Sequence, residues 1–175
     1  SDRTGQDHHH VPKTETTKRN RYANLTLVEG TRVHLREAAA SLSDYINANY
    51  IHLPQKEDGD DASPNSAPLI VTQTPMESTT EHFWSMCFDH GVPLIVMLND
   101  FDEVGRAKLV PYLPLEKGQT VRWGDFDVEC ESCLEEDSGW CHRTLRLTRR
   151  SSSESHTLTH LQAQQWEDFG TLTED

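Results

Sequence analysis

Apolar and polar side chains alternate in short segments of this chain, and the alternation predicts strands. In residues 44–51 aromatic or aliphatic side chains are interleaved with small polar ones, as expected for a half-buried strand. Residues 69–73 form a second strand candidate. Between them, residues 55–67 combine acidic side chains with glycine, proline and serine, which is the composition of a loop. We therefore expect two strands joined by an acidic loop that extends a hairpin outward.

The next segment predicts a helix that leads directly into a buried strand. Ser78 and Glu81 have the spacing of a capping box, and Gly91 is a stop signal. The apolar positions between these signals recur at helical spacing: Phe83, Trp84, Cys87 and Phe88. Residues 92–98 are continuously apolar, which is typical of a strand buried on both faces. A helix followed at once by such a strand indicates an α/β layer arrangement.

The C-terminal half predicts an antiparallel meander. Apolar residues in 126–130 alternate with acidic ones, and Leu145 and Leu147 alternate with basic neighbours that include Arg143 and Arg146. We expect these two strands to be joined through residues 131–139, and a last strand near residues 156–162 to follow.

Composition limits the size and the class of the protein. The chain has 175 residues, enough for one domain or part of one. Only 34% of the residues are hydrophobic, which is low for a globular protein. Residues 1–17 are polar and include three adjacent histidines, so we interpret them as a flexible lead-in and residues 18–175 as the folded part. No cysteine or acidic partner accompanies these histidines at ligand spacing.

Charge and cysteine content narrow the partners and the compartment. The chain has 16 basic and 29 acidic residues and a net charge of −13, which disfavours nucleic acid as a partner. A phosphorylated side chain stays possible as a ligand, because amides and one or two arginines hold a phosphate at contact range. No apolar run reaches the length of a membrane span, and no secretory leader is recognised. With four cysteines, this predicts a reducing compartment, the cytoplasm.

Several separated segments resemble the protein tyrosine phosphatases and follow the order found in that family. The matching segments are Lys18-Arg19-Asn20-Arg21-Tyr22, Asp44 to Ile51, Thr72-Gln73-Thr74-Pro75, Phe83-Trp84-x-Met86, Val96-Met97-Leu98, Glu103-x-Gly105-x-x-Lys108, Tyr112-Leu113-Pro114 and Trp166-Glu167-Asp168-Phe169-Gly170. The resemblance implies an α/β domain with a highly twisted mixed β-sheet flanked by helices. It also implies that residues 18–175 are the N-terminal part of that domain.

By the same resemblance, Tyr22 and Asn24 contact the substrate. The tyrosine at this position forms one wall of a deep slot and stacks on the phosphotyrosine ring, and the depth of the slot excludes the shorter phosphoserine. The family usually has aspartate where this chain has Asn24. Asparagine still accepts a hydrogen bond from a peptide amide but lacks the charge, so we expect weaker or altered peptide binding.

The resemblance assigns Asp168 as the general acid of an acid loop that contains Trp166. A phenolate is a poor leaving group because the phenol pKa is about 10, so a positioned proton donor accelerates its departure. Glu167 replaces the family's proline. Glutamate leaves the backbone freer and places a second carboxylate beside Asp168, which predicts less complete loop closure and a raised pKa of Asp168.

Two charged residues are expected to support the site from outside. The resemblance implies that Glu103 orients the phosphate-binding arginine and that Lys108 approaches the acid loop. Asn47, Gln73 and Arg32 are interpreted as scaffold polar groups rather than reactants.

The family's nucleophile motif, His-Cys-x5-Arg, does not occur in this chain. Cys141-His142-Arg143 has the wrong order, so we interpret Cys141 as a strand residue. The complete enzyme would form a cysteinyl-phosphate intermediate and use no metal cofactor, whereas this chain alone is predicted to be inactive. An alternative function is a catalytically dead relative that binds phosphotyrosine or serves as a scaffold.

A third function class is a zinc-binding module. The candidate ligands are Cys130, Cys133, Cys141 and His142. Against it, adjacent residues in a strand point to opposite faces, which would separate Cys141 from His142.

Overall fold

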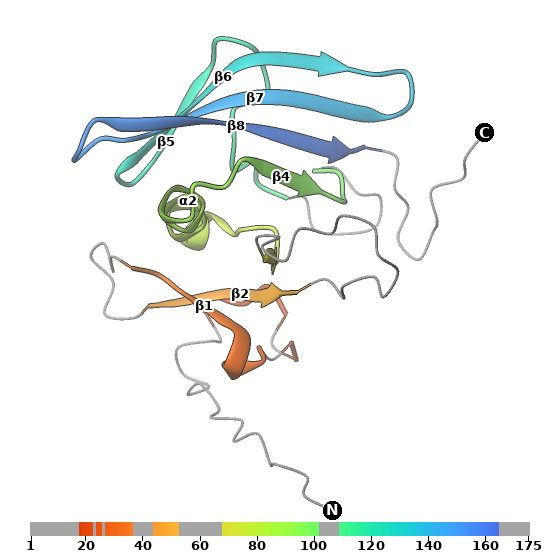
Figure 1. Ribbon diagram of the computed structural model, residues 1–175. Coiled ribbons are helices and arrows are strands. Elements are labelled where there is room, and N and C mark those ends of the chain that lie inside the picture. The colour runs from red at the N-terminus through yellow and green to blue at the C-terminus, as the bar shows by residue number, and fades with distance from the viewer. Residues whose placement is uncertain are drawn as a thin grey trace, which may run out of the picture. The chain divides into compact units, whose positions relative to one another are not determined.

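The computed structural model describes residues 18–22, 24–25, 27–36, 44–52, 68–101 and 109–164. The chain divides into two compact units, residues 1–73 and residues 74–175. Each unit contains its own sheet, so the two are described separately (Figure 1).

The first unit is built on a three-stranded antiparallel sheet. Its strands are β1 (Arg32–His34), β2 (Tyr45–Ile51) and β3 (Leu69–Thr72), in the order β1-β2-β3. The predicted strands at residues 44–51 and 69–73 are confirmed, and they pair directly in an antiparallel register. The predicted acidic loop, residues 55–67, lies outside the described residues. β1 was not predicted because three residues are too few to establish an alternating pattern.

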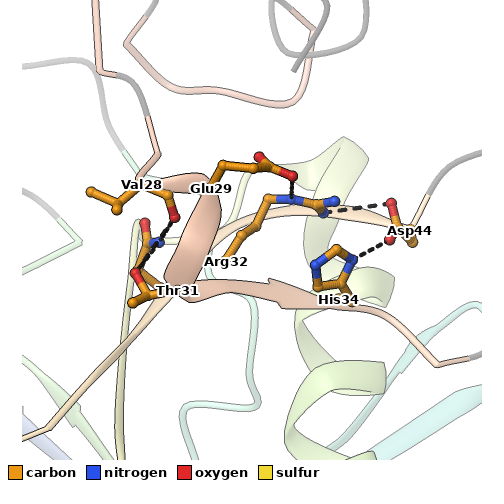
Figure 2. A network of polar contacts seen from close by, with 7 residues as sticks. Val28, Glu29, Thr31, Arg32, His34 and Asp44 are labelled. Atoms are coloured by element: carbon orange, nitrogen blue, oxygen red, sulfur yellow. Dashed lines mark hydrogen bonds and ion pairs between the residues drawn. The ribbon is translucent and has the colours of Figure 1, made fainter. Parts of the chain in front are cut away.

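A polar network joins β1 and β2 to the short 3-10 helix η1 (Glu29–Thr31), as Figure 2 shows. The buried guanidinium of Arg32 contacts Glu29 Oε1 at 3.2 Å and Asp44 Oδ1 at 3.5 Å. His34 Nδ1 contacts the other carboxylate oxygen of Asp44. The hydrogen bond to His34, and after it the positive charge and hydrogen bond of Arg32, hold the pKa of Asp44 below its usual value. Arg32 is therefore the scaffold group that the sequence suggested.

The second unit contains a five-stranded mixed sheet in the order β4-β8-β7-β6-β5. The strands are β4 (Leu94–Met97), β5 (Thr120–Trp123), β6 (Phe126–Glu135), β7 (Trp140–Arg149) and β8 (Glu154–Ala163). β4 pairs parallel with β8, and every other pair is antiparallel. The predicted meander is confirmed as β6-β7-β8. With a helix packed on it, this mixed sheet also confirms the α/β class.

The helix is α2 (Thr80–Asp89), which follows the 3-10 turn η2 (Glu77–Thr79) and packs against β5, β6 and β7 (Figure 1). The prediction that Ser78 and Glu81 form a capping box is wrong. Ser78 lies within η2, the Thr79 hydroxyl accepts a hydrogen bond from Met76 N at 3.0 Å, and Glu81 Oε1 accepts one from Asp125 N at 3.1 Å. The glycine stop is confirmed, since Gly91 has φ of 54°.

An aromatic cluster forms the centre of the second unit. Trp84 donates from Nε1 to the carbonyl of Tyr112 at 3.0 Å, and Phe83 meets both rings edge to face, with ring centroids 5.2 Å apart. Two of the segments that carry the family resemblance therefore meet in the core.

The prediction that residues 92–98 are buried on both faces is wrong for the structure described. Leu94, Val96 and Leu98 are 46%, 49% and 52% exposed, whereas Met97 is buried at 4%. Successive strand residues point to opposite faces, so one face of β4 lies in the core and the other faces solvent.

The hairpin of β6 and β7 is longer than predicted. Residues 131–135, expected as part of the connection, continue β6, and the turn spans only residues 136–139. A register shift between Cys130 and Ser132 marks a β-bulge. Among the described residues, no helix is long and apolar enough to cross a membrane.

Candidate functional site

The structure describes two of the six predicted site residues. Tyr22 and Asn24 lie in the first unit and are both exposed. The other four, Glu103, Lys108, Trp166 and Asp168, lie outside the described residues, as does Glu167. The structure therefore describes side chains only for the two predicted substrate contacts, and on the part of the chain predicted to carry the acid it describes the strands that precede residue 165.

Gln73 holds the segment that carries Tyr22. Its side-chain amide accepts a hydrogen bond from Arg21 N at 2.9 Å and donates one to the carbonyl of Arg19 at 2.8 Å. Gln73 directly follows β3, so the segment is fixed to the sheet of its own unit. Both polar atoms of one amide are satisfied by the backbone on either side of Asn20, which defines the course of the chain there.

Tyr45 provides a second anchor for the same segment. Its hydroxyl donates to Asn20 Oδ1 at 2.7 Å, and its carbonyl accepts a hydrogen bond from Arg19 Nη1 at 3.2 Å. Tyr45 is 2% exposed, and burial raises the pKa of its hydroxyl, which stays protonated and able to donate. Asn20 and Tyr45 belong to two segments that resemble the phosphatase family, but the resemblance assigned neither residue a role. Their pairing across 25 positions has no local signal.

Tyr22 itself projects from this anchored segment. Its side chain is 47% exposed, and its carbonyl accepts a hydrogen bond from Leu25 N at 3.3 Å, which closes a turn around Asn24. An exposed aromatic ring on a fixed backbone can stack on another ring with little loss of conformational entropy. The exposed Asn24 amide, two residues away, can accept a hydrogen bond from a peptide.

In the second unit, the two parallel strands β4 and β8 end side by side. β4 and β8 pair in register up to Met97 and Gln162, so their carboxyl ends lie at one edge of the sheet. Gln162 Nε2 donates to the carbonyl of Asn99 at 3.4 Å, and Leu109 N donates to the carbonyl of Phe101 at 3.0 Å. The second bond joins the described residues on either side of residues 102–108. Ligands of α/β sheets commonly bind at such strand ends.

Comparison with known proteins identifies the family. The sequence model described as "Protein-tyrosine phosphatase" matches residues 16–174. The chain belongs to the protein-tyrosine phosphatase family. It is 31% identical over 154 residues to mouse (Mus musculus) "Tyrosine-protein phosphatase non-receptor type 9", which covers 87% of this chain and 24% of that protein.

Two further relatives match this chain at similar identity and over a similar share of its length. "Tyrosine-protein phosphatase non-receptor type 23" of Rattus norvegicus is 32% identical over 152 residues, which is 87% of this chain and 9% of the relative. "Receptor-type tyrosine-protein phosphatase eta" of Mus musculus is 34% identical over 158 residues, which is 89% of this chain and 12% of the relative. The chain thus spans at most a quarter of the length of these relatives.

A buried polar group lies near the strand ends of the phosphatase sheet. Arg143, on β7, is 4% exposed and donates from Nη1 to Gln162 Oε1 at 2.9 Å. The sequence interpretation of Arg143 was wrong, because it shares the inner face with Leu145 and Leu147 instead of alternating with them. Arg143 is two positions before Leu145, so the alternation of the strand placed it on the same face as the leucines. A positive charge on that apolar face was not expected.

His160 on β8 belongs to the same interior. Its Nε2 lies 2.9 Å from the hydroxyl of Tyr112, and the ring is fully buried. Burial, with the nearby positive charge of Arg143, lowers the pKa of His160 to about 3. The imidazole is therefore neutral at physiological pH and packs in the core against Tyr112.

The zinc interpretation receives no support from the part of the chain that the structure describes. His142 lies on the face of β7 opposite Cys141, and its Nε2 contacts Glu136 Oε1 at 3.2 Å. No group of three histidine, cysteine or acidic side chains among the described residues could hold a metal ion. The thiols of Cys133 and Cys141 do lie close together, with 3.7 Å between their sulfurs.

Proposed function

We propose that the complete protein hydrolyses phosphotyrosine in proteins or peptides and that this chain contributes the substrate-binding wall and the general acid. The observation that carries the proposal is the exposed ring of Tyr22 on a segment anchored by Gln73 and Tyr45, in a chain of this family. The chain by itself is inactive because it contains no His-Cys-x5-Arg motif.

In the proposed reaction, a cysteine thiolate outside this sequence attacks the phosphorus atom. The phosphorus–oxygen bond to the tyrosine breaks, and the phenolate leaves with a proton from the carboxyl group of Asp168. Water then releases phosphate from the cysteine. Tyr22 stacks on the ring of the substrate, and Asn24 accepts a hydrogen bond from the substrate backbone. Residues 18–175 are, in this proposal, the N-terminal part of the catalytic domain.

The remaining proposed site residues act on these groups. Glu103 orients the arginine that holds the phosphoryl oxygens, Lys108 lies near the acid loop, and Trp166 anchors that loop. No metal cofactor is required, because positive charge and backbone amides stabilise the phosphoryl group. Glu167 makes closure of the loop less complete. In the complete enzyme, Glu167→Pro should therefore raise kcat and shift its pH profile; no change in either would contradict this role.

We place this activity in the cytoplasm, with phosphotyrosine proteins as partners and without nucleic acid. The net charge of −13 disfavours a polyanion, and all four cysteines are free thiols in the described structure. Both observations support the compartment and the partner class.

The decisive experiment is a hydrolysis assay on the longest protein that contains this chain. It should release phosphate from a phosphotyrosine peptide and not from the matched phosphoserine peptide. Replacement of Asp168 by asparagine should lower kcat by roughly 10²- to 10⁴-fold, the usual contribution of a general acid. Release of phosphate from both peptides at equal rates would contradict the proposal.

Tyr22 provides a matched pair of variants for the binding step. Tyr22→Phe keeps the ring and should leave KM unchanged, whereas Tyr22→Ala should raise KM roughly 2- to 10-fold, the value of an aromatic contact. Equal KM values for the two variants would show that the ring of Tyr22 does not contact the substrate. The alternative function, a catalytically dead phosphotyrosine-binding module, is favoured by Asn24 and Glu167. It would appear as saturable phosphopeptide binding without hydrolysis.

A further inference from the structure

Three thiols lie on the inner face of the β6–β7 hairpin. In a regular strand Cys130 and Cys133 would point to opposite faces, because they are three positions apart. The bulge between Cys130 and Ser132 adds one residue, so Cys130 pairs with Leu145 and Cys133 pairs with Arg143. Leu145 and Arg143 both occupy the buried face of β7, which also carries Cys141. Strand pairing thus brings three cysteines to one face of the hairpin, which their spacing in the sequence alone does not predict.

We propose that Cys133 and Cys141 are a site of reversible oxidation and form an intrachain disulfide when a hydroperoxide is present. Their sulfur atoms are 3.7 Å apart, within hydrogen-bonding distance of each other. This site is distinct from the proposed phosphatase chemistry, and its test requires no phosphatase activity.

The hairpin can bring the two sulfurs to bonding distance. A disulfide bond is about 2.05 Å long, so the sulfurs must approach by roughly 1.7 Å. β5 pairs with β6 only from Phe126 to Glu129. From residue 131 to residue 135, β6 therefore pairs only with β7 among the described strands, so this part of β6 is a sheet edge that can shift. β7 is held by β8 on its other side, so the approach comes from the movement of Cys133 toward Cys141.

The two thiols differ in their access to an oxidant. Cys133 is partly exposed, whereas Cys141 is fully buried. Burial raises the pKa of Cys141 to about 12, although the positive charge of Arg143 lowers it in part. Because the thiolate is the nucleophile, the buried thiol is a poor first reactant. Cys133 is thus the residue that meets the oxidant, and Cys141 resolves the product.

The chemistry proceeds in two steps. The Cys133 thiolate attacks one oxygen of hydrogen peroxide, a sulfur–oxygen bond forms, the oxygen–oxygen bond breaks, and hydroxide leaves as water after protonation. Cys141 then loses its proton and attacks the Cys133 sulfur, which forms the disulfide and expels the second water. Two thiols are oxidised and one peroxide is reduced to two waters.

Cys130 is the neighbouring thiol that the proposal leaves out. It is completely buried, and its thiol donates a hydrogen bond to the carbonyl of Ser132 at 3.2 Å. That bond holds the sulfur toward the backbone of the bulge. Cys130 therefore serves as the internal control, since it shares the face and the strand but not the contact with Cys141.

The experiment treats the purified, reduced chain with hydrogen peroxide and maps disulfides by digestion and mass spectrometry. We expect a peptide pair linked through Cys133 and Cys141, lighter by two hydrogen atoms and restored to thiols by dithiothreitol. Cys130→Ser should retain this linkage. Cys141→Ser should lose it and instead trap Cys133 as a sulfenic acid that dimedone labels.

Circular dichroism of each reduced variant establishes that it is folded before oxidation. A linkage that involves Cys130 or Cys87, a linkage only between two chains, or oxidation of Cys133 to sulfinic acid in the unmodified chain without a disulfide would overturn the proposal. If Cys141→Ser does not fold, Cys133→Ser tests the same point, since it should leave Cys141 unreactive toward peroxide.

Discussion

Arg143 and Gln162 are joined by a hydrogen bond of 2.9 Å between Nη1 and Oε1, and their side chains are among the most buried polar groups of the second unit. The bond connects β7 to the end of β8, from which Gln162 also reaches the carbonyl of Asn99 after β4. Three strands are thus tied together by polar groups just before the segment that carries Asp168 in the sequence.

A double-mutant cycle should measure this connection. Gln162→Leu leaves Nη1 of the buried Arg143 without its acceptor, while Nε keeps the carbonyl of Leu115 at 3.4 Å, and should lower the free energy of unfolding by about 1.5–3 kcal/mol. Adding Arg143→Met removes the charge as well, so the double variant should lose less than the sum of the two single losses. Urea denaturation of the four proteins gives the coupling. Additive losses would show that the two side chains do not stabilise each other.

Stability should decrease in acid because of His160. Its folded pKa of about 3 lies below the ordinary value of 6.5, so the unfolded chain binds more protons. The stabilisation is complete above pH 6.5 and is lost progressively as the pH falls toward 3, by about 3 kcal/mol at pH 4.

His160→Gln offers the control for this pH dependence. Glutamine does not titrate and can still bond the hydroxyl of Tyr112. His156, whose pKa burial also lowers, is present in both proteins and cancels in the comparison. Urea denaturation from pH 7 to pH 4 should give a steeper loss for the native chain than for the variant. Parallel curves would mean that His160 does not govern the acid response.

Gln73 should control the order of the segment that carries Tyr22. Gln73→Ala removes both amide hydrogen bonds to the backbone of Arg19 and Arg21 and should favour local opening by about 1–2 kcal/mol. Trypsin should then cleave after these arginines roughly 5- to 30-fold faster.

Gln73→Glu and Gln119→Ala define the range of this effect. The glutamate keeps the acceptor for Arg21 N and loses the donor, so cleavage should be intermediate. Gln119 is exposed, and its side chain is hydrogen-bonded to Glu116, in the second unit and away from Arg19 and Arg21 in the sequence, so its loss should leave cleavage unchanged. Equal cleavage rates of the Gln73→Ala variant and the native chain would show that Gln73 does not hold this segment in place.

Trp84 should contribute more to stability than Trp123, although both are tryptophans of the second unit. Trp84→Phe loses the hydrogen bond to the carbonyl of Tyr112 and leaves a cavity in the core, at a cost of about 2–4 kcal/mol. The indole N–H of Trp123 is buried without a hydrogen-bond partner in the described structure, so Trp123→Phe should cost less than about 1 kcal/mol. Thermal or urea unfolding compares the two. A larger loss for Trp123→Phe would contradict this order.

Local sequence signals predicted elements well where one residue pattern sufficed. The alternation in residues 44–51, the helical spacing from Phe83 to Phe88 and the meander of the C-terminal half all became β2, α2 and β6-β7-β8. The signals failed where the partner was distant. The Ser78 capping box was wrong because Thr79 and Met76 bond each other, and Glu81 is occupied by Asp125, 44 positions away.

The sequence determined the family and its candidate chemistry, because motifs such as Lys18 to Tyr22 and Trp166 to Gly170 are matters of residue type and order. Tertiary structure decided which polar groups are scaffold. Strand pairing decided that a bulge brings Cys133 to the face of the sheet that carries Cys141, a relation with no signature in either segment alone. The inward position of Arg143 follows the alternation of its own strand, but only the buried partner Gln162 explains how a positive charge is accommodated there. Hydrogen bonds between distant positions depend on the path of the backbone, which is a property of the fold as a whole.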